Sequence, residues 1–492
     1  MNTAFLQKAE ALKPELFHQK ILPVNGTSVD AMNTGDRSVF DFGNHHVGYL
    51  TITLSAKGNH YDAPAWIRFQ FAEQLCELDE DPAQYKGWIS KSWIQQEQIH
   101  VDVLPCTITL PRRYAFRYVQ IEVLAVSSYS LAVESISCDS VTSADDKALL
   151  PFSADAPLER IDAIACRTLR SCMQSVFEDG PKRDRRLWMG DLRLQALANY
   201  TTYRNFDLVK RCLYLFAGTT LPDGAVPSCL YLEPEVEGGN ASLLDYALLY
   251  IPALLDYLEA SSDMETVKEL YPVAMRQLEI SRTKFSSDGV IDDVPGITWC
   301  FIDWDLKLNK QTSAHGVFLY CLDAAIRLSE KLGIDAHELK NEFNEKRSAA
   351  KAAFWDKQLN LFCSGAEKQI SWASQIWMIL GGVLAPEESA DLLQRLEGFP
   401  EAHQMVTPYL YHYYVEALFS IGQDQKAFQV IRSYWGAMAN AGADTYWEFY
   451  DPKNPGFSPY GGTIVNSYCH AWSCAPAWFC RKKYSEGQAQ LK

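Results

Sequence analysis

The segment Asp179–Asp191, with the sequence DGPKRDRRLWMGD, holds three acidic and four basic residues. Gly180 and Pro181 end the helical pattern that precedes it, and Asp191 can begin the next helix, so we expect a loop. Arginine–carboxylate pairs would fix these side chains, and nearby positive charge lowers the pKa of some carboxyls while burial raises that of others. General acid and base catalysis requires such a split in pKa. The alternative is a salt-bridged loop that only caps two helices.

A second candidate is Glu448, which lies among aromatic residues in the segment Asp444–Asp451, DTYWEFYD. The Gly- and Pro-rich sequence PKNPGFSPYGGT follows, and Val465–His470 is predicted to begin the last helix. A carboxylate beside flat rings can be partly desolvated, and the rings can stack on the faces of sugars. This pairing is typical of carbohydrate sites. The alternative is an acid at a helix N-terminus among core aromatics.

A third candidate is the segment 296–305, GITWCFIDWD, which is predicted to be a loop between helices. Trp304 stands between Asp303 and Asp305, and a tryptophan beside an aspartate offers both stacking and hydroxyl recognition. Trp299 fits core packing better than a ligand site. The three segments together favour a site that binds a sugar.

Motifs for metals and cofactors are missing from the sequence. His315, His403 and His412 have no partner at a spacing suited to metal ligation. There is no Gly-rich phosphate loop, no Gly-x-Ser-x-Gly elbow and no usable Cys/His motif. We therefore expect chemistry that needs neither a metal ion nor an organic cofactor.

Two kinds of sequence pattern must position these segments. From Val39 to about Cys138, apolar and polar residues alternate, as in VGYLTITLSA and FRYVQIEVLAV, which predicts an antiparallel β-sandwich. After Leu158 the apolar period becomes helical. The predicted domains are an N-terminal β-sandwich over 1–140, a linker over 141–157 and a helical domain over 158–492.

The helical domain is predicted to contain roughly twelve helices, many of them paired by short loops. An even set of helical hairpins favours an (α/α)6 barrel, although a helical solenoid would show a similar pattern. A closed barrel would bring Asp184 and Glu448 together from opposite ends of the domain, whereas a solenoid would not. The predicted helices are 158–176, 190–203, 205–217, 241–260, 263–284, 311–332, 336–355, 370–382, 386–396, 407–421, 424–440 and 462–480.

The composition excludes several functional classes. A chain of 492 residues with 48% hydrophobic and 22% charged residues can bury several cores. Its net charge of -16 would repel phosphate backbones and anionic lipids, so we expect no nucleic-acid partner and no membrane association. Residues 1–23 have no continuous apolar stretch of the kind a signal peptide needs. The 13 cysteines contain no CxxC pair, which favours reduced thiols and a cytoplasmic location.

At these segments the chain resembles glycoside hydrolase family 78, the α-L-rhamnosidases. FDFGNHHVGYLTITL, FQFAEQL and YAFRYVQIEV resemble the β-sandwich domain that precedes the barrel in that family. DGPKRDRRLWMGD resembles its signature loop, and IDW resembles its Trp-bearing sugar loop. TYWEFYD and VNSYCHAW resemble its Thr-x-Trp-Glu and Asn-His segments. These landmarks follow the order of the family along nearly the whole sequence.

The resemblance implies roles for particular residues. Glu448 would be the general base that activates water. The general acid of the family is usually a glutamate seven residues before the last aspartate of the signature loop, and here that position holds Asp184. The aspartate shortens the reach by one methylene, about 1.5 Å. Glu178 is a second candidate for the acid. The residues implied in sugar binding are Asp179, Arg183, Trp188, Asp191, Trp304, Trp447 and His470.

The implied function is that of an inverting α-L-rhamnosidase that releases terminal L-rhamnose from oligosaccharides or glycosides. Inversion requires the two carboxyls to stand about 6.5–9.5 Å apart, to admit a water. The alternatives are a six-hairpin glycosidase for another α-linked deoxy- or uronic sugar, and a non-catalytic carbohydrate-binding homologue. Many relatives continue into a C-terminal β domain, whereas this chain stops soon after its last predicted helix. A homodimer is one way to supply the walls of a more open cleft.

Overall fold

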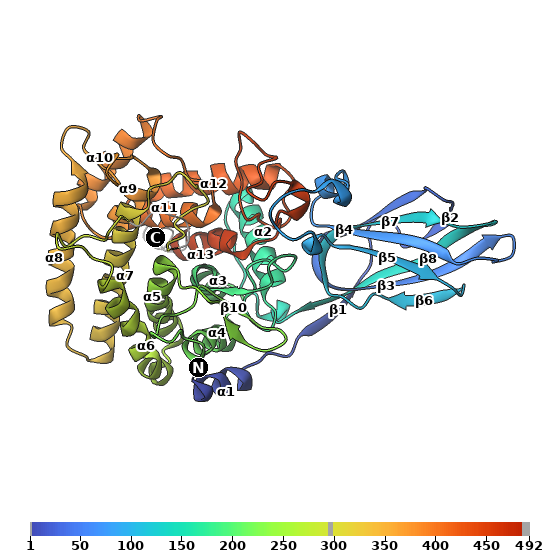
Figure 1. Ribbon diagram of the computed structural model, residues 1–492, viewed down its shortest axis with the longest axis horizontal. Coiled ribbons are helices and arrows are strands. Elements are labelled where there is room, and N and C mark those ends of the chain that lie inside the picture. The colour runs from blue at the N-terminus through green and yellow to red at the C-terminus, as the bar shows by residue number, and fades with distance from the viewer. Residues whose placement is uncertain (1, 294–298, 485–492) are drawn as a thin grey trace.

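The computed structural model describes residues 2–293 and 299–484 and has two parts, a β domain and a larger helical domain (Figure 1). The first three residues of the predicted sugar loop 296–305 lie outside the described residues. The chain begins with helix α1 (Thr3–Ala11), which packs against α4 of the helical domain before the chain crosses to the first strand. The predicted domain boundaries stay predictions.

The β domain is built from antiparallel pairs in the strand order β1-β8-β3-β7-β4-β5, with β2 on β8 and β6 on β3. The long strand β3 shifts register between Asp41 and His46 and pairs with both β7 and β8. The eight strands β1 to β8 therefore form one hydrogen-bonded network. Their bounds are β1 (Phe17–Ile21), β2 (Val29–Met32), β3 (Arg37–Gly58), β4 (Ala65–Ala72), β5 (Gln96–Val101), β6 (Cys106–Thr109), β7 (Tyr114–Ala125) and β8 (Tyr129–Thr142).

Twelve helices, α2 to α13, form the helical domain within the described ranges. The short β9 (Leu187–Trp188) and β10 (Cys229–Tyr231) pair beside them. The helices are α2 (Ala156–Cys172), α3 (Met189–Thr201), α4 (Phe206–Gly218), α5 (Leu244–Ser261), α6 (Met264–Arg282), α7 (Gln311–Leu332), α8 (His337–Phe354), α9 (Trp372–Leu380), α10 (Pro386–Glu397), α11 (Pro408–Ser420), α12 (Asp424–Asn440) and α13 (Ala475–Phe479).

The odd-numbered helices from α3 to α13 form a closed inner ring. Each contacts the next in the order α3, α5, α7, α9 and α11, then the 3-10 helix η6 (Ala471–Cys474) before α13, and α13 returns to α3. Helix α3 is buried on all sides from Met189 to Tyr200, whereas α8 buries only Ala350 and Phe354, as expected for an inner and an outer helix. The predicted fold class is confirmed as an antiparallel β domain followed by an (α/α)6 barrel, and the sandwich arrangement of the β domain stays a prediction.

The predicted helix 462–480 is wrong as one continuous α-helix. The segment contains the 3-10 helix η5 (Thr463–Val465), an irregular stretch over 466–470, then η6 and the five-residue α13. In the irregular stretch the backbone N–H of Tyr468 donates to Glu73 of the β domain at 2.7 Å, and that of His470 donates to the Tyr446 carbonyl at 2.9 Å. These long-range bonds replace helical ones over 466–470, so His470 is the N-cap residue of η6 and does not lie within a helix that begins near 462.

Three further features concern the described residues alone. None of their helices combines the length and hydropathy needed to cross a membrane. No group of three or more His, Cys, Asp or Glu side chains is arranged there to hold a metal ion. All 13 cysteines are free thiols, most of them buried.

Candidate active site

A pocket of about 200 Å³ opens at the mouth of the barrel where the inner helices begin. Asp191 lies in the first turn of α3, Lys310 immediately precedes α7, and His470 immediately precedes η6. Helix N-termini carry partial positive charge, which suits a site rich in carboxylates. The pocket brings together eight residues predicted from the sequence, which are Asp179, Arg183, Asp184, Trp188, Asp191, Trp304, Glu448 and His470.

Glu448 is held at the pocket by two charge-assisted hydrogen bonds. Arg183 Nη2 donates to one carboxylate oxygen and the hydroxyl of Tyr460 donates to the other. The backbone is also fixed, because Trp472 Nε1 donates to the Glu448 carbonyl at 2.8 Å. The side chain is 4% exposed, so an acceptor is fixed in a nearly dry position.

Arg183 also lies between the two candidate catalytic carboxylates. Its Nη1 is 3.5 Å from Asp184 Oδ1, while its Nη2 binds Glu448. Its Nε donates to the Val465 carbonyl at 2.9 Å, and its guanidinium lies 4.2 Å from the centre of the Tyr460 ring. Because both carboxylates contact one guanidinium, they lie far less than ~15 Å apart. At a larger separation, a mechanism that uses both carboxylates would require a large conformational change to bring them together.

Asp184 is the more accessible of these two carboxylates. Its side chain is 19% exposed, and Arg186 Nη1 lies 3.3 Å from its Oδ2. A more open carboxyl at the pocket wall can contact a molecule bound in the pocket.

Asp179 is a buried carboxyl beside Asp184, and its pKa is raised to near neutrality. It accepts hydrogen bonds from the backbone N–H groups of Arg186 at 3.1 Å and Asp184 at 3.3 Å. Burial, followed by the negative charge of Asp184, raises the pKa of Asp179 to about 7. Near that pH its carboxyl can act as a donor or as an acceptor toward a sugar hydroxyl.

His470 and Asp191 form a buried ion pair on the pocket floor. His470 Nε2 lies 3.0 Å from Asp191 Oδ1. Burial alone would lower the pKa of His470, but the hydrogen bond to Asp191 and the charge of Glu448 outweigh it and raise this pKa to about 9. The histidine is therefore a cation at neutral pH and adds positive charge beside three carboxylates.

The pKa of His470 predicts a loss of stability at alkaline pH. A raised pKa means that the pair contributes fully below the usual value of 6.5 and loses its contribution as the pH rises through about 9. The Tm of the wild type should therefore fall more steeply between about pH 7 and pH 10 than that of His470→Gln. His18→Gln, which removes the exposed pair with Asp139, is the control. Parallel Tm profiles for the wild type and His470→Gln would contradict the assignment.

Two buried aspartates fix the loop that carries Trp304. Asp245 accepts hydrogen bonds from the backbone N–H groups of Phe301 at 3.0 Å and Ile302 at 2.9 Å. Asp303 accepts a hydrogen bond from the hydroxyl of Thr407 at 2.6 Å. Burial raises the pKa of Asp303 to about 6, although the hydrogen bonds that its carboxylate accepts act to lower that pKa. Asp303 thus acts as an anchor for the loop, while the neighbouring Trp304 lines the pocket.

Several pocket residues escaped the sequence analysis. The most important is Tyr460, which binds Glu448 but lies in a Gly- and Pro-rich segment that shows no periodicity. Trp472 follows His470 by two residues and ends the segment VNSYCHAW. An aromatic residue so close to a predicted site residue was the signal that could have identified it. Asp303 and Asp305, which the sequence analysis noted beside Trp304, also line the pocket, and the remaining lining residues are Leu243, Tyr246, Phe301, Leu306 and Lys310.

Two sequence candidates are not brought to the pocket. Trp447 packs its ring against Tyr450 at 5.5 Å and Tyr468 at 5.2 Å, centre to centre, and does not line the cavity. Glu178 binds Arg113 of the β domain at 2.8 and 2.9 Å. Trp447 precedes Glu448 directly in the sequence, but only Glu448 lines the pocket.

The β domain supports the pocket from behind. Lys182, fully buried, binds Glu77 of the β domain and donates to the carbonyls of Ile464 at 3.0 Å and Asn466 at 2.9 Å. The hydroxyl of Tyr85 donates to the Tyr460 carbonyl at 2.8 Å. The segment 457–468 is therefore held between the two domains.

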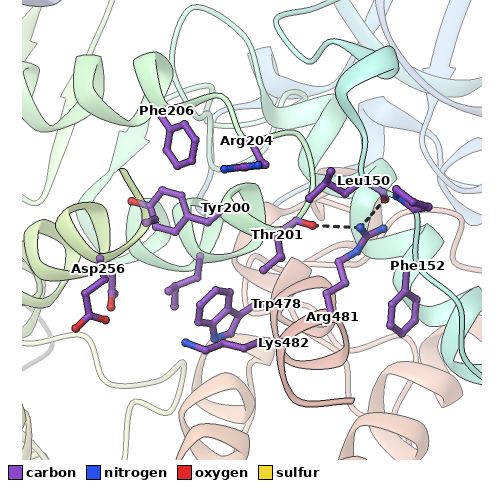
Figure 2. Close-up of a pocket in the computed structure, with 14 residues that line it drawn as sticks. Leu150, Phe152, Tyr200, Thr201, Arg204, Phe206, Asp256, Trp478, Arg481 and Lys482 are labelled. Carbon is purple, nitrogen blue, oxygen red and sulfur yellow. Dashed lines mark hydrogen bonds between the residues drawn. The ribbon is translucent and has the colours of Figure 1, made fainter. Parts of the chain in front are cut away.

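A second cavity, of about 440 Å³, lies at the opposite mouth, where α3, α5 and α13 end (Figure 2). Its aspartate, Asp256, binds Arg193 at 3.0 Å, and its glutamate, Glu259, lies 3.0 Å from Arg327. The two carboxylates therefore bind different arginines, whereas at the first mouth the single guanidinium of Arg183 contacts both Asp184 and Glu448. The pair of carboxylates suited to acid and base chemistry is at the first mouth.

Comparison with known families agrees with this geometry. Residues 13–140 match the glycosyl hydrolase family 78 alpha-rhamnosidase N-terminal domain, and residues 152–483 match the bacterial alpha-L-rhamnosidase six-hairpin glycosidase domain. A search of curated proteins gives no match.

Solved structures give the same picture. A rhamnosidase from Klebsiella oxytoca with rhamnose bound is 44% identical, with 98% of this chain and 99% of that one covered and a TM-score of 0.94. A family 78 rhamnosidase of Bacillus sp. GL1 is 22% identical over 92% of this chain and 47% of its own, with a TM-score of 0.78. A mannosylglycerate hydrolase from Thermus thermophilus is 12% identical over 65% and 99%, with a TM-score of 0.51. The last two likenesses concern the fold alone.

Proposed function

The chain belongs to glycoside hydrolase family 78, and from that membership we propose that it is an α-L-rhamnosidase that releases terminal L-rhamnose from a glycoside. The observation that carries the proposal is the pocket in which Arg183 joins Asp184 and Glu448. A similar protein over its whole length, at 44% identity, binds rhamnose.

The proposed reaction inverts the anomeric centre. Asp184, in its protonated form, gives its proton to the glycosidic oxygen as the C1–O bond breaks. A water attacks C1 from the opposite face and loses a proton to Glu448, so the product is β-L-rhamnose and the aglycone leaves as an alcohol. Arg183 and Tyr460 fix the base, which reduces the reorganisation that the transition state requires.

Two measurements test this proposal. Aryl glycosides of α-L-rhamnose, α-L-arabinose, β-D-glucuronic acid and α-D-mannose should be compared by kcat/KM, with the rhamnoside expected to be the best substrate. Proton NMR during the first minutes should show the β-anomer of L-rhamnose before mutarotation. Initial release of the α-anomer would contradict inversion, and preference for another sugar would contradict the substrate.

The hydrogen bond from Tyr460 to Glu448 predicts a measurable loss in a conservative variant. Tyr460→Phe should reduce kcat/KM by about 10–100-fold, because a hydrogen bond to a charged group contributes ~1.5–3 kcal/mol. Tyr214→Phe removes a similar bond to Glu269 outside the pocket and should leave kcat/KM unchanged. Equal rates for Tyr460→Phe and the wild type would show that the hydroxyl does not assist the base.

A further inference from the structure

An apolar chamber of about 600 Å³ adjoins the sugar pocket. The two cavities share Trp304, Asp305 and Leu306, so a molecule in the pocket can extend directly into the chamber. Asp305 is the only charged residue among the described residues that line the chamber, and its carboxylate is 2.8 Å from His403. The apolar walls are Trp88, Trp304, Leu306, Val406, Phe457 and Pro459.

Two of these walls are large apolar side chains left open to solvent. Trp88 is 67% exposed and Leu306 is 72% exposed. Trp88 is nevertheless fixed, because its Nε1 donates to the Pro459 carbonyl at 2.9 Å and its ring lies 5.4 Å from that of Tyr460. A fixed, exposed tryptophan offers a flat apolar face to a ligand. Because its side chain is already ordered, binding of the ligand does not cost the entropy of ordering that side chain.

The contributing residues come from both domains. Trp88 belongs to the β domain, between β4 and β5, whereas Leu306 follows the sugar loop of the helical domain. Trp304 lies at the boundary between the two cavities and lines both. A sugar ring bound in the first cavity would therefore direct the group on its glycosidic oxygen toward Trp88 and Leu306.

We propose that this chamber binds the leaving group of the substrate, that the preferred leaving group is flat and apolar, and that Trp88 is a specificity-determining residue supplied by the β domain. This inference rests on the proposed rhamnosidase function. Trp88 contacts no reacting atom in this proposal and selects the aglycone by burying its apolar surface.

The experiment compares two substrates with the same sugar and different leaving groups, 2-naphthyl α-L-rhamnoside and an α-L-rhamnosyl-(1→6)-glucose disaccharide. The readout is the ratio of kcat/KM for the naphthyl substrate to kcat/KM for the disaccharide. The intrinsic difference in reactivity between the two leaving groups is the same for every variant, so it cancels when the ratios of two variants are compared. Trp88→Ala and Leu306→Asn should each lower the ratio by about tenfold, because apolar contacts of this size discriminate by that order. Trp66→Ala removes an exposed tryptophan elsewhere on the β domain and should leave the ratio unchanged.

The ratio also separates selection from general damage. Because Trp88 packs near Tyr460, its loss could slow both substrates, but an equal slowing leaves the ratio at the wild-type value. An unchanged ratio in both Trp88→Ala and Leu306→Asn, in an enzyme that hydrolyses rhamnosides, overturns the chamber while leaving the proposed function intact. A wild type that hydrolyses neither rhamnoside overturns the proposed function, and this inference with it.

Discussion

Replacing Glu448 by glutamine should lower kcat by about 10²–10⁴-fold, and by the same factor for activated aryl rhamnosides and for rhamnosyl disaccharides. Every inverting turnover needs a water deprotonated in the transition state, whatever the leaving group. Glutamine keeps the shape of the side chain and can still accept from Tyr460, but it cannot take a proton. The measurement is kcat on both substrate types under saturating conditions.

Glu178→Gln is the matched control for Glu448→Gln. Glu178 is also a buried glutamate paired with an arginine, Arg113, but it lies outside the pocket. Both variants replace a buried carboxylate that pairs with an arginine, so the Tm should fall in both. The rate should fall only in Glu448→Gln. A loss of rate that follows Tm in both variants would mean that Glu448 has a structural role alone.

The helical barrel could be predicted because its signal is local. Apolar residues recur at the helical period in each segment, and the predicted helix 336–355 differs by one residue at each end from α8, His337–Phe354. The even set of hairpins favoured a closed barrel but left a solenoid open, and it is the closed ring of the structure that places Asp184 and Glu448 in one pocket.

The remaining errors have a common physical cause, which is contact between distant parts of the chain. The segment 466–470 was assigned to a helix because nothing near it in the sequence shows that Glu73, almost 400 residues earlier, accepts the N–H of Tyr468. Tyr460 was missed for the same reason. The β domain approaches its backbone so closely that a Cβ on Gly87 would lie 1.8 Å from the Tyr460 carbonyl oxygen.

Resemblance and geometry separate the candidates for the general acid. The resemblance placed Asp184 at the position of the acid and left Glu178, which directly precedes the signature loop, as a second candidate. The pocket contains Asp184, whereas Glu178 is turned toward Arg113 of the β domain and its carbonyl accepts from Gln195 at 2.7 Å. The geometry therefore favours Asp184, the residue that departs from the usual glutamate of the family.

Asp184→Asn should make turnover depend steeply on the leaving group. General acid catalysis is worth about 10²–10⁴ in rate when the departing oxygen needs a proton, so disaccharides and phenyl rhamnosides should lose most of their kcat/KM. A 2,4-dinitrophenyl rhamnoside leaves without assistance and should be affected far less. The measurement is the slope of log kcat/KM against the pKa of the departing phenol, which should become more negative in Asp184→Asn than in the wild type.

Two variants make this slope decisive. Asp256→Asn also removes an arginine-paired aspartate from a cavity wall, at the opposite mouth, and its side chain is 18% exposed against 19% for Asp184. It should keep the wild-type slope. Glu178→Gln should also keep it, since its carboxylate binds Arg113 and does not reach the pocket. If Glu178→Gln steepens the slope and Asp184→Asn does not, Glu178 is the acid. If neither does, the leaving oxygen takes its proton from another group, and the titrating carboxyl of Asp179 becomes the next candidate.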